Sequence, residues 1–406
     1  MITVEEYQER VLGHVEPLAP RPVPVAEAHG LRLAQDVVAV LAVPPFDNSA
    51  MDGFAVRAAD LAGAGEDTPV ALPVDGDVPA GTTEPTPVGP GRAVRIMTGA
   101  PLPPGADAVV PVELSDQLPG ATALPTRVLL RRAPAEGAHV RRRGEDVRPG
   151  DVVVTAGTVL AATHLSAAVS AGHGELLVHP RPRVGVLATG DELCAPGTDP
   201  GPGRIPDSNS LLVAGLVREA GAQPVPLGAV GDDPETLRAV VEAALPGLDA
   251  LVTSGGVSVG TKDVVKAALS GELDFTTVAM QPGKPQGFGL LAGRVPVFAL
   301  PGNPVSVMVS FHVHVAPALR RLLGQPARVP LATARAAVGW RCPPGRRQYL
   351  PVTVDDGPVP SVHPASAGGS GSHLVASLAA AQALAVVAED IDAVAPGDEV
   401  GLLRWS

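Results

Sequence analysis

The chain has 406 residues, which at roughly 100–200 residues per domain predicts two to four domains. Apolar residues make up 45% and aromatic residues only 2%, so the core must be built mainly from Val, Leu and Ala. The net charge of −12 argues against a general attraction to nucleic acid or to an anionic membrane. An anionic ligand would therefore need locally concentrated positive charge.

The cellular compartment is predicted from cysteine usage and hydropathy. Cys194 and Cys342 stand far apart and form neither a disulfide framework nor a C-x-x-C metal site. The N-terminus is acidic where a signal peptide is basic, and no run has the ~18–20 apolar residues needed to span a bilayer. We expect a cytoplasmic protein with neither a nucleic-acid partner nor a membrane partner.

The first predicted element is a helix over residues 3–18, which Pro17 is expected to close. Thr3 and Glu6 have the spacing of a capping box. Apolar residues recur at three- and four-residue steps: Val4, Tyr7, Val11, Val15 and Leu18. A strand is predicted over residues 31–40.

Residues 44–140 change to short β-branched runs between Pro/Gly turns, which predicts a β-rich segment. Residues 151–160 then predict a strand pair around Gly157, and residues 161–171 predict a short helix. This later material resembles the first 40 residues in kind. One domain is therefore expected to combine both, with the β-rich segment inserted between them.

Residues 180–324 alternate strands and helices, which predicts βαβ units and a mostly parallel sheet. The expected strands are 184–188, 225–230, 248–253 and 295–300, and helices are expected at 208–221, after Asp233 and from Pro304. Residues 327–406 return to short Pro/Gly-rich strands and predict a small C-terminal β domain.

Polar, glycine-rich loops follow three of these strands: residues 188–193, 253–260 and 301–306. In an open α/β sheet, ligands bind beyond the carboxyl ends of the strands, so the three loops should converge on one crevice. Glycines allow close approach to an anion, and helix N-termini add a favourable dipole. The loops match neither a dinucleotide fingerprint nor a Walker-type P-loop. The sequence therefore predicts a phosphate-bearing ligand, although each loop taken alone is equally explained as a tight turn.

Charged residues accompany these loops. Acidic side chains beside a phosphate site indicate bridging Mg²⁺, and the acids here are Asp191, Glu192, Asp232, Asp233 and Asp263. Helix capping is the alternative role for Asp232 or Asp233. Lys284 offers a point positive charge between prolines, whereas Arg141–Arg143 is either a solvated run or an anion contact. His312 and His314 are expected to be packing or surface residues.

The β-rich segment carries a polar cluster at 47–52, where Asp52-Gly53 is alternatively a plain hairpin turn. Taken with the loops above, the motifs resemble one family, the molybdopterin molybdotransferases, which also include the E domain of gephyrin. The resemblance spans nearly the whole chain, in the family's order: NSAMDGFA (48–55), TGAPLPPGADAVV (98–110), GED (144–146), ATGDEL (188–193), DSN (207–209), TSGGVSVG (253–260), QPGKP (281–285) and PGNPVS (301–306).

The resemblance implies a multidomain α/β plus β fold with four domains. These are an N-terminal α+β linking domain (1–44 and 141–178), an inserted β-rich domain (45–140), a three-layer α/β/α molybdopterin-binding domain (179–326) and a small C-terminal β-barrel (327–406). It also implies a homodimer with shared active sites, and molybdopterin adenylyltransferase and molybdoenzymes as partners. The implied reaction inserts molybdate into adenylylated molybdopterin with Mg²⁺-assisted release of AMP.

The resemblance also assigns site residues. Asp52, Thr98 and Asp146 would serve the partner chain's site, while Glu192, Asp232 and Asp263 would act in catalysis and hold the metal. The pterin phosphate and adenylate would contact Asp207, Ser208, Ser254, Gly255, Gly256 and Ser258. Molybdate would contact Lys284, Pro285 and Ser306, helped by Arg346 and Ser372.

The chain departs from the family's pattern at three positions. Gln281 stands where the family often has a basic residue, Gln348 replaces a common Glu, and Pro351 replaces a common Arg. Two alternatives to an insertase stay open: a molybdopterin adenylyltransferase, which the α/β segment alone would suit, and a non-enzymatic scaffold. The long N-terminal β insertion argues against the first, and the intact acidic and serine positions argue against the second.

Overall fold

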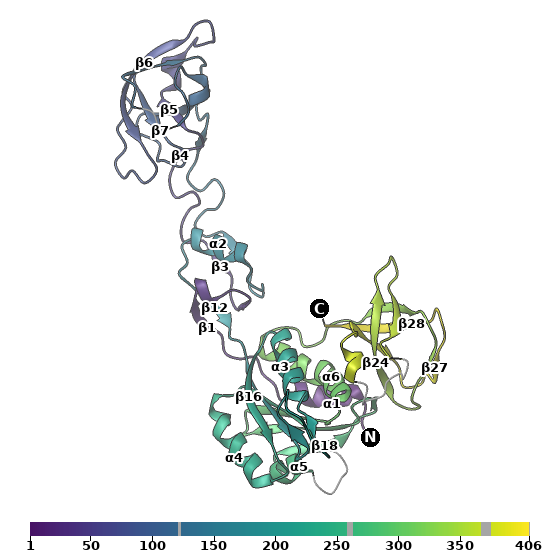
Figure 1. The fold of residues 1–406 in the computed structure, drawn as a ribbon. Coiled ribbons are helices and arrows are strands. Elements are labelled where there is room, and N and C mark those ends of the chain that lie inside the picture. Colours follow the sequence, from purple (N-terminus) through teal and green to yellow (C-terminus); the bar gives the residue numbers. More distant parts are fainter. Residues whose placement is uncertain (121–122, 258–262, 367–374, 406) are drawn as a thin grey trace. The chain divides into compact units, whose positions relative to one another are not determined.

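The computed structural model of the protein describes residues 1–120, 123–257, 263–366 and 375–405. The chain forms two compact units (Figure 1). One contains residues 1–21, 30–34 and 178–406, and the other contains residues 22–29 and 35–177. No helix in the described residues is long and apolar enough to cross a membrane.

The larger unit begins with helix α1 and continues through an α/β region. Its helices are α1 (Val4–Leu12), α3 (Asn209–Glu219), α4 (Pro234–Ala244), α5 (Val264–Leu269), α6 (Pro304–Ser310), α7 (Ala316–Leu322) and α8 (Val375–Leu378). Its strands up to the end of the α/β region are β2 (Arg32–Leu33), β13 (Arg183–Thr189), β14 (Leu193–Cys194), β15 (Ile205–Pro206), β16 (Gln223–Val230), β17 (Ala250–Ser254), β18 (Leu273–Thr277), β19 (Met280–Gln281), β20 (Pro285–Leu291) and β21 (Val295–Leu300).

Six of these strands form one sheet in the order β16-β13-β17-β21-β20-β18. The first four run parallel, as the alternation of strands and helices predicted. The last two, β20 and β18, are antiparallel additions that were not predicted from the sequence. The predicted helices after residues 208 and 233 and from Pro304 are all present.

Alternate residues of the sheet pack into two different hydrophobic clusters, because successive side chains of a strand point to opposite faces. Val186 and Val252 pack with α1, α3, α6 and α7. Leu187 and Leu251 pack with α4 and α5. Helices therefore cover both faces of the sheet, and each cluster excludes water from one of them (Figure 1).

Helix α1 begins as predicted, with the capping box between Thr3 and Glu6. Its predicted length was wrong, because the helix ends at Leu12 and Gly13 caps it. Val15 still packs into the α/β core, and so do Tyr7 and Val11. The apolar stripe thus continues past the last helical turn, which is why the pattern overstated the helix. Residues 1–21 lie in the same compact unit as the α/β region.

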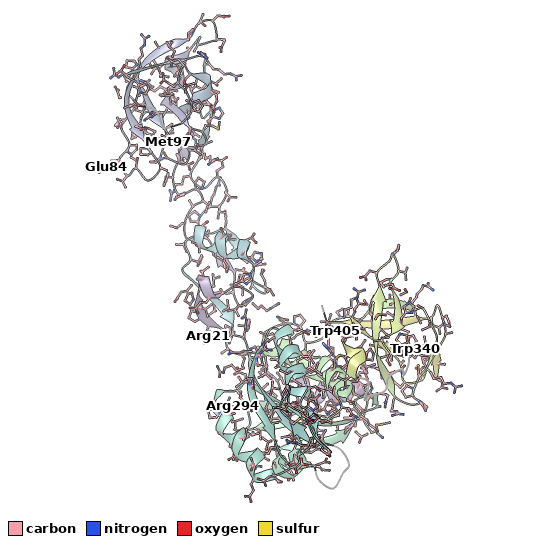
Figure 2. The ribbon with its side chains drawn as sticks, viewed as in Figure 1. Arg21, Glu84, Met97, Arg294, Trp340 and Trp405 are labelled. Carbon is pink, nitrogen blue, oxygen red and sulfur yellow. The ribbon has the colours of Figure 1, made fainter. Side chains whose placement is uncertain are left out.

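The C-terminal part of the larger unit is a closed five-stranded barrel. Its strands are β22 (Ala332–Ala336), β24 (Arg347–Asp355), β25 (Ser361–Pro364), β26 (Ala383–Val387) and β28 (Glu399–Arg404), beside a short pair formed by β23 (Trp340–Arg341) and β27 (Ala393–Val394). Pairing of β24 with both β25 and β26 closes the barrel. The chain's two tryptophans, Trp340 and Trp405, both belong to this C-terminal part (Figure 2).

The smaller unit contains a five-stranded sheet in the order β8-β5-β7-β6-β9, which bears out the prediction of β-rich structure. Its elements are β3 (Val37–Val38), β4 (Asn48–Ser49), β5 (Gly53–Val56), β6 (Val70–Val78), β7 (Ala93–Ile96), β8 (Ala108–Pro111), β9 (Arg127–Leu130), β10 (Val140–Arg141), β11 (Val152–Val154) and α2 (Ala162–Ser170). Two further strands, β1 (Arg21–Pro24) and β12 (Glu175–His179), lie where the chain passes between the units.

Two predicted strands in this part of the chain were wrong in extent. Residues 151–160 form no strand pair: only β11 is present, and it pairs with β3. Residues 31–40 form two short strands, β2 and β3, rather than one. Each piece pairs with a segment more than a hundred residues further along the chain, so a local pattern does not define where it ends.

Candidate functional site

The glycine-rich loops of the α/β region meet at the carboxyl ends of the parallel strands, as the sequence predicted. They line one cavity of about 520 Å³. Segments from all three predicted loops contribute, namely residues 189–193, 254–257 and 301–306, together with residues 205–209 and 281–285. The cavity lies within the size range of small-molecule sites.

Backbone contacts tie these loops to one another. The Gly255 N–H donates to the carbonyl oxygen of Leu300 at 3.0 Å, which joins the end of β17 to the end of β21. A Cβ on Gly255 would lie 2.6 Å from the Thr189 carbonyl oxygen, and Gly255 has φ +97°. Only glycine fits this approach without strain. Because its N–H is already engaged, Gly255 shapes the site rather than donating to a ligand.

The start of α3 forms a second wall of the cavity. Asp207 accepts a hydrogen bond from the Ser210 N–H at 3.0 Å, which satisfies one of the helix's free N–H groups. The Asn209 side chain donates to the Gly302 carbonyl oxygen at 2.7 Å. This contact couples the first residue of α3 to the loop before α6. Asn209 stands in the DSN motif, but it was not predicted from the sequence to be a site residue.

The loop that carries Lys284 is held from behind by a buried glutamine. Gln286, 1% exposed, donates from Nε2 to the Gly283 carbonyl oxygen and to Ser310 Oγ, both at 2.6 Å. The Val278 N–H also donates to the Lys284 carbonyl oxygen at 2.9 Å. Lys284 itself lines the cavity, so its ammonium is carried on a braced loop.

Charge on the cavity wall is mostly negative. Among the described lining residues the acids are Glu192, Asp207, Asp232 and Asp263, and the one cation is Lys284. In the described part of the chain, no group of three or more His, Cys, Asp or Glu side chains is close enough to hold a metal by itself. Mg²⁺ usually takes one or two carboxylates and completes its shell with water and substrate phosphate. These acids fit such a shared site, not a closed protein cage.

Capping explains Asp233 and not Asp232. Asp233 accepts hydrogen bonds from the Thr236 hydroxyl and, at 3.0 Å, from the Thr236 N–H, and so caps α4. These hydrogen bonds hold the pKa of its carboxyl below the usual value. Asp232 instead lines the cavity, and its own N–H donates to Asp191 Oδ1 at 3.0 Å. The pair flagged by the sequence thus divides into a cap and a cavity residue.

Arg346 reaches the cavity through another residue. Its Nη1 donates to Gln281 Oε1 at 2.8 Å, and Gln281 lines the cavity. Ser258 and Ser372 lie outside the described residues. The remaining predicted site residues of the larger unit all line the cavity: Glu192, Asp207, Ser208, Asp232, Ser254, Gly255, Gly256, Asp263, Lys284, Pro285 and Ser306.

The smaller unit brings two of its three predicted residues together. Asp52 Oδ1 accepts hydrogen bonds from the Thr98 N–H at 2.6 Å and from Thr98 Oγ1 at 2.9 Å. Both residues are exposed, and so is Asp146, whose N–H donates to the Val43 carbonyl oxygen. Asp52 also lines a cavity of about 270 Å³ within this unit. In the basic run at residues 141–143, Arg142 forms an ion pair with Asp47.

His312 and His314 are packing residues, as expected, at 8% and 1% exposure. They belong to a π-helical turn, Phe311–Val315, between α6 and α7. Burial lowers the pKa of His312 to about 4 and that of His314 to about 3, so both are neutral near pH 7. His312 stacks on Trp405 with ring centroids 4.7 Å apart.

The fold and the cavity define an α/β protein with a candidate small-molecule site at the carboxyl ends of its parallel strands. Three family models match the chain in order. They describe the "MoeA N-terminal region (domain I and II)" at residues 2–172, a "probable molybdopterin binding domain" at 185–321, and the "MoeA C-terminal region (domain IV)" at 333–405.

Individual relatives agree with these matches. The chain is 42% identical to molybdopterin molybdenumtransferase 2 of Mycobacterium tuberculosis, over 98% of both proteins. It is 33% identical to the molybdopterin molybdenumtransferase of Haemophilus influenzae, again over 98% of both. Among solved structures, a molybdopterin biosynthesis MoeA protein from Pyrococcus horikoshii aligns with a TM-score of 0.81 and 30% identity, covering 100% of this chain and 99% of that one. The chain therefore belongs to the molybdopterin molybdenumtransferase family, an enzyme family of molybdenum cofactor biosynthesis.

Proposed function

We propose that the protein inserts molybdenum from molybdate into adenylylated molybdopterin and releases AMP. One observation carries this proposal: three loops, the start of α3 and the Lys284 loop converge on a single cavity with clustered carboxylates and one lysine. A phosphorylated ligand with a leaving nucleotide suits the strand-end position. A tetrahedral oxyanion suits the lysine end of the same cavity.

The adenylylated pterin is bound along the glycine-rich loops. Ser254, Gly256 and Ser208 line this part, and the neutral hydroxyls of the serines donate to phosphate oxygens without adding charge. Asp207 is engaged in capping α3 and orients the wall beside them. Ser258 is assigned to the same subsite by the family resemblance.

Glu192, Asp232 and Asp263 are the carboxylates from which one or two would hold Mg²⁺ once the phosphorylated ligand is bound. When bound, the ion neutralises charge on the phosphoanhydride and so favours departure of AMP. Without it, the carboxylates would repel an anionic ligand.

Molybdate binds at the other end of the cavity, against Lys284, Pro285 and Ser306. Arg346 of the C-terminal domain approaches this subsite through its hydrogen bond to Gln281, and the family resemblance assigns Ser372 to the same subsite. The lysine supplies charge, and the Ser306 hydroxyl, 4% exposed, supplies a donor. Discrimination between molybdate and other tetrahedral oxyanions of similar size is not expected from charge alone.

We further propose a four-domain protomer with a three-layer α/β/α molybdopterin-binding domain, acting as a homodimer. In this arrangement Asp52, Thr98 and Asp146 of one protomer complete the cavity of the other. Their exposure and the Asp52–Thr98 hydrogen bonds support this, because an exposed carboxylate held by two donors is pre-positioned for a partner surface.

The test is a cofactor-reconstitution assay with Asp52→Ala and Asp263→Ala, and with Glu66→Ala as an exposed acidic control. Both site variants should lose at least ~100-fold in rate, because each removes a carboxylate from the reaction centre, while Glu66→Ala keeps wild-type activity. Normal activity from both site variants would overturn the assignment. Consumption of ATP with formation of adenylylated pterin would instead indicate an adenylyltransferase. A protein that binds neither pterin nor AMP would indicate a scaffold.

A further inference from the structure

Gln281 and Arg346 connect the cavity to the C-terminal barrel. Gln281 belongs to β19 and lines the cavity, whereas Arg346 stands directly before β24, after Gly345 at φ +64°. The hydrogen bond between them, Arg346 Nη1 to Gln281 Oε1 at 2.8 Å, joins residues 65 positions apart. Both side chains are partly buried, so this contact is not a solvent-exposed pairing.

The backbone on both sides of this hydrogen bond is fixed. Strands β19 and β24 pair in parallel, with Met280 opposite Arg347 and Gln281 opposite Gln348. The Arg347 N–H donates to the Ala279 carbonyl oxygen at 2.9 Å. The start of β24, directly after Arg346, therefore lies hydrogen-bonded beside β19, whose Gln281 lines the cavity.

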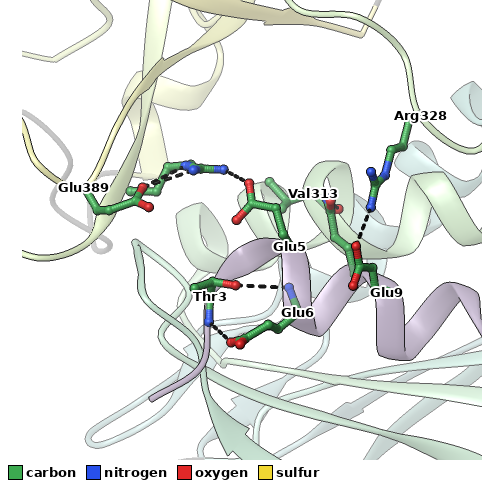
Figure 3. Close-up of polar contacts among 9 residues, drawn as sticks. Thr3, Glu5, Glu6, Glu9, Val313, Arg328 and Glu389 are labelled. Atoms are coloured by element: carbon green, nitrogen blue, oxygen red, sulfur yellow. Dashed lines mark hydrogen bonds and ion pairs between the residues drawn. The ribbon is translucent and has the colours of Figure 1, made fainter.

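The Arg347 side chain adds a second restraint, and its two partners, Glu5 and Glu389, are labelled in Figure 3. Its guanidinium pairs with Glu389 of the barrel at 3.1 Å and with Glu5 of α1. Barrel, helix α1 and β24 are thus joined at the residue next to Arg346. Because Arg347 is held by both ion pairs, the backbone of Arg346 has little freedom. The long Arg346 side chain can still adopt several rotamers, so a hydrogen-bond partner is needed to select one orientation.

The orientation of the Arg346 guanidinium matters because the described wall of the cavity is mostly negative. The described wall carries four carboxylates against Lys284 alone, which disfavours an oxyanion. A guanidinium beside Gln281 adds a second positive charge at the same end. Gln281 can accept from it, because the glutamine side chain presents a carbonyl oxygen, whereas a lysine there would repel it.

We propose that Gln281 is a positioning residue that holds the Arg346 guanidinium at the Lys284 end of the cavity, where it binds an oxyanion substrate. This inference rests on the proposed function. The positive charge at this end of the cavity thus comes partly from the barrel. Gln281 is itself neutral, but its hydrogen bond holds the Arg346 guanidinium at the position where a basic residue would otherwise supply the charge. Gln281 acts only through Arg346, so removing either one removes the same interaction.

The experiment measures binding of inorganic molybdate and, separately, of AMP to the full-length protein by calorimetry. We expect Arg346→Ala to weaken molybdate binding by ~10-fold or more, Gln281→Ala by ~3–10-fold, and the double variant no more than Arg346→Ala. AMP binding should stay within ~2-fold in all three, which also reports that the site is folded. Arg341→Ala, which removes an exposed arginine of β23, is the charge-matched control and should bind molybdate normally.

Three outcomes decide the matter. Gln281→Ala with wild-type molybdate affinity overturns the proposal, and so does a double variant whose losses multiply, since Gln281 would then act independently. A wild-type protein that binds neither molybdate nor AMP refutes the proposed function and this inference with it. In turnover, the same variants should raise KM for molybdate more than they lower kcat, because the contact exists before the chemical step.

Discussion

Gly255→Ala is the substitution for which the structure gives the most specific prediction. The new methyl group would lie 2.6 Å from the Thr189 carbonyl oxygen, at a residue with φ +97°. Alanine in the left-handed region costs about 1–2 kcal/mol, and a close approach to a fixed backbone atom adds about 1–3 kcal/mol of strain. The expected destabilisation is therefore about 2–5 kcal/mol.

The assay compares Gly255→Ala with Gly302→Ala by thermal unfolding, and Gly255→Ala with wild type by AMP binding. At about 2–4 °C per kcal/mol for a domain of this size, Gly255→Ala should lower the Tm of the α/β transition by roughly 4–20 °C. It should also weaken AMP binding, because relief of the clash must move the β17 loop away from β13. Gly302 lies in the same loop cluster, and a Cβ there would meet nothing closer than the Gly255 Cα at 3.5 Å.

Gly302→Ala should therefore keep the wild-type Tm; because Gly302 lines the cavity, it is the control for unfolding and not for AMP binding. Equal Tm values for the two variants would refute this reasoning, because they differ in backbone strain and not in composition.

Two further predictions concern buried polar groups. Gln286→Leu leaves the Gly283 carbonyl and the Ser310 hydroxyl without their buried hydrogen-bond donor. We expect the free energy of unfolding, measured by urea titration, to fall by about 2–4 kcal/mol. Gln325→Leu, at a partly exposed position, is the control. Unchanged stability would show that the Lys284 loop is braced by other contacts. Burial lowers the pKa values of His312 and His314 below the ordinary 6.5. The unfolded state therefore binds more protons than the folded state below pH 6.5. The free energy of unfolding is unaffected by these groups above pH 6.5 and falls as the pH drops toward the folded-state pKa values. Between pH 6.5 and 5 the two together should cost up to about 4 kcal/mol, and His314→Phe should remove roughly half of this slope; an unaltered slope would assign the acid sensitivity to other groups.

The sequence alone determined the class of fold and most of the cavity. Strand-helix alternation in residues 180–324 defined a mostly parallel sheet, and in such a sheet the polar loops must share one edge. Eleven of the predicted residues in the larger unit, from Glu192 to Ser306, accordingly line one cavity. The capping box at Thr3 was equally local, since it depends on residues three apart.

Tertiary structure decided what depends on contacts between distant segments. The sequence could not place β18 and β20, because antiparallel strands added to a parallel sheet have no strand-loop-helix signature of their own. It could not show that the Gly255 N–H is engaged by Leu300, or that Asp233 is a cap and Asp232 is not. It marked Gln281 as a lost charge, whereas the fold brings Arg346 to it from 65 residues away. Residue types and local spacing indicate which chemistry a chain can perform. Only the pairing of β19 with β24 brings the Arg346 guanidinium next to Gln281 at the cavity, because that pairing joins segments far apart in the sequence.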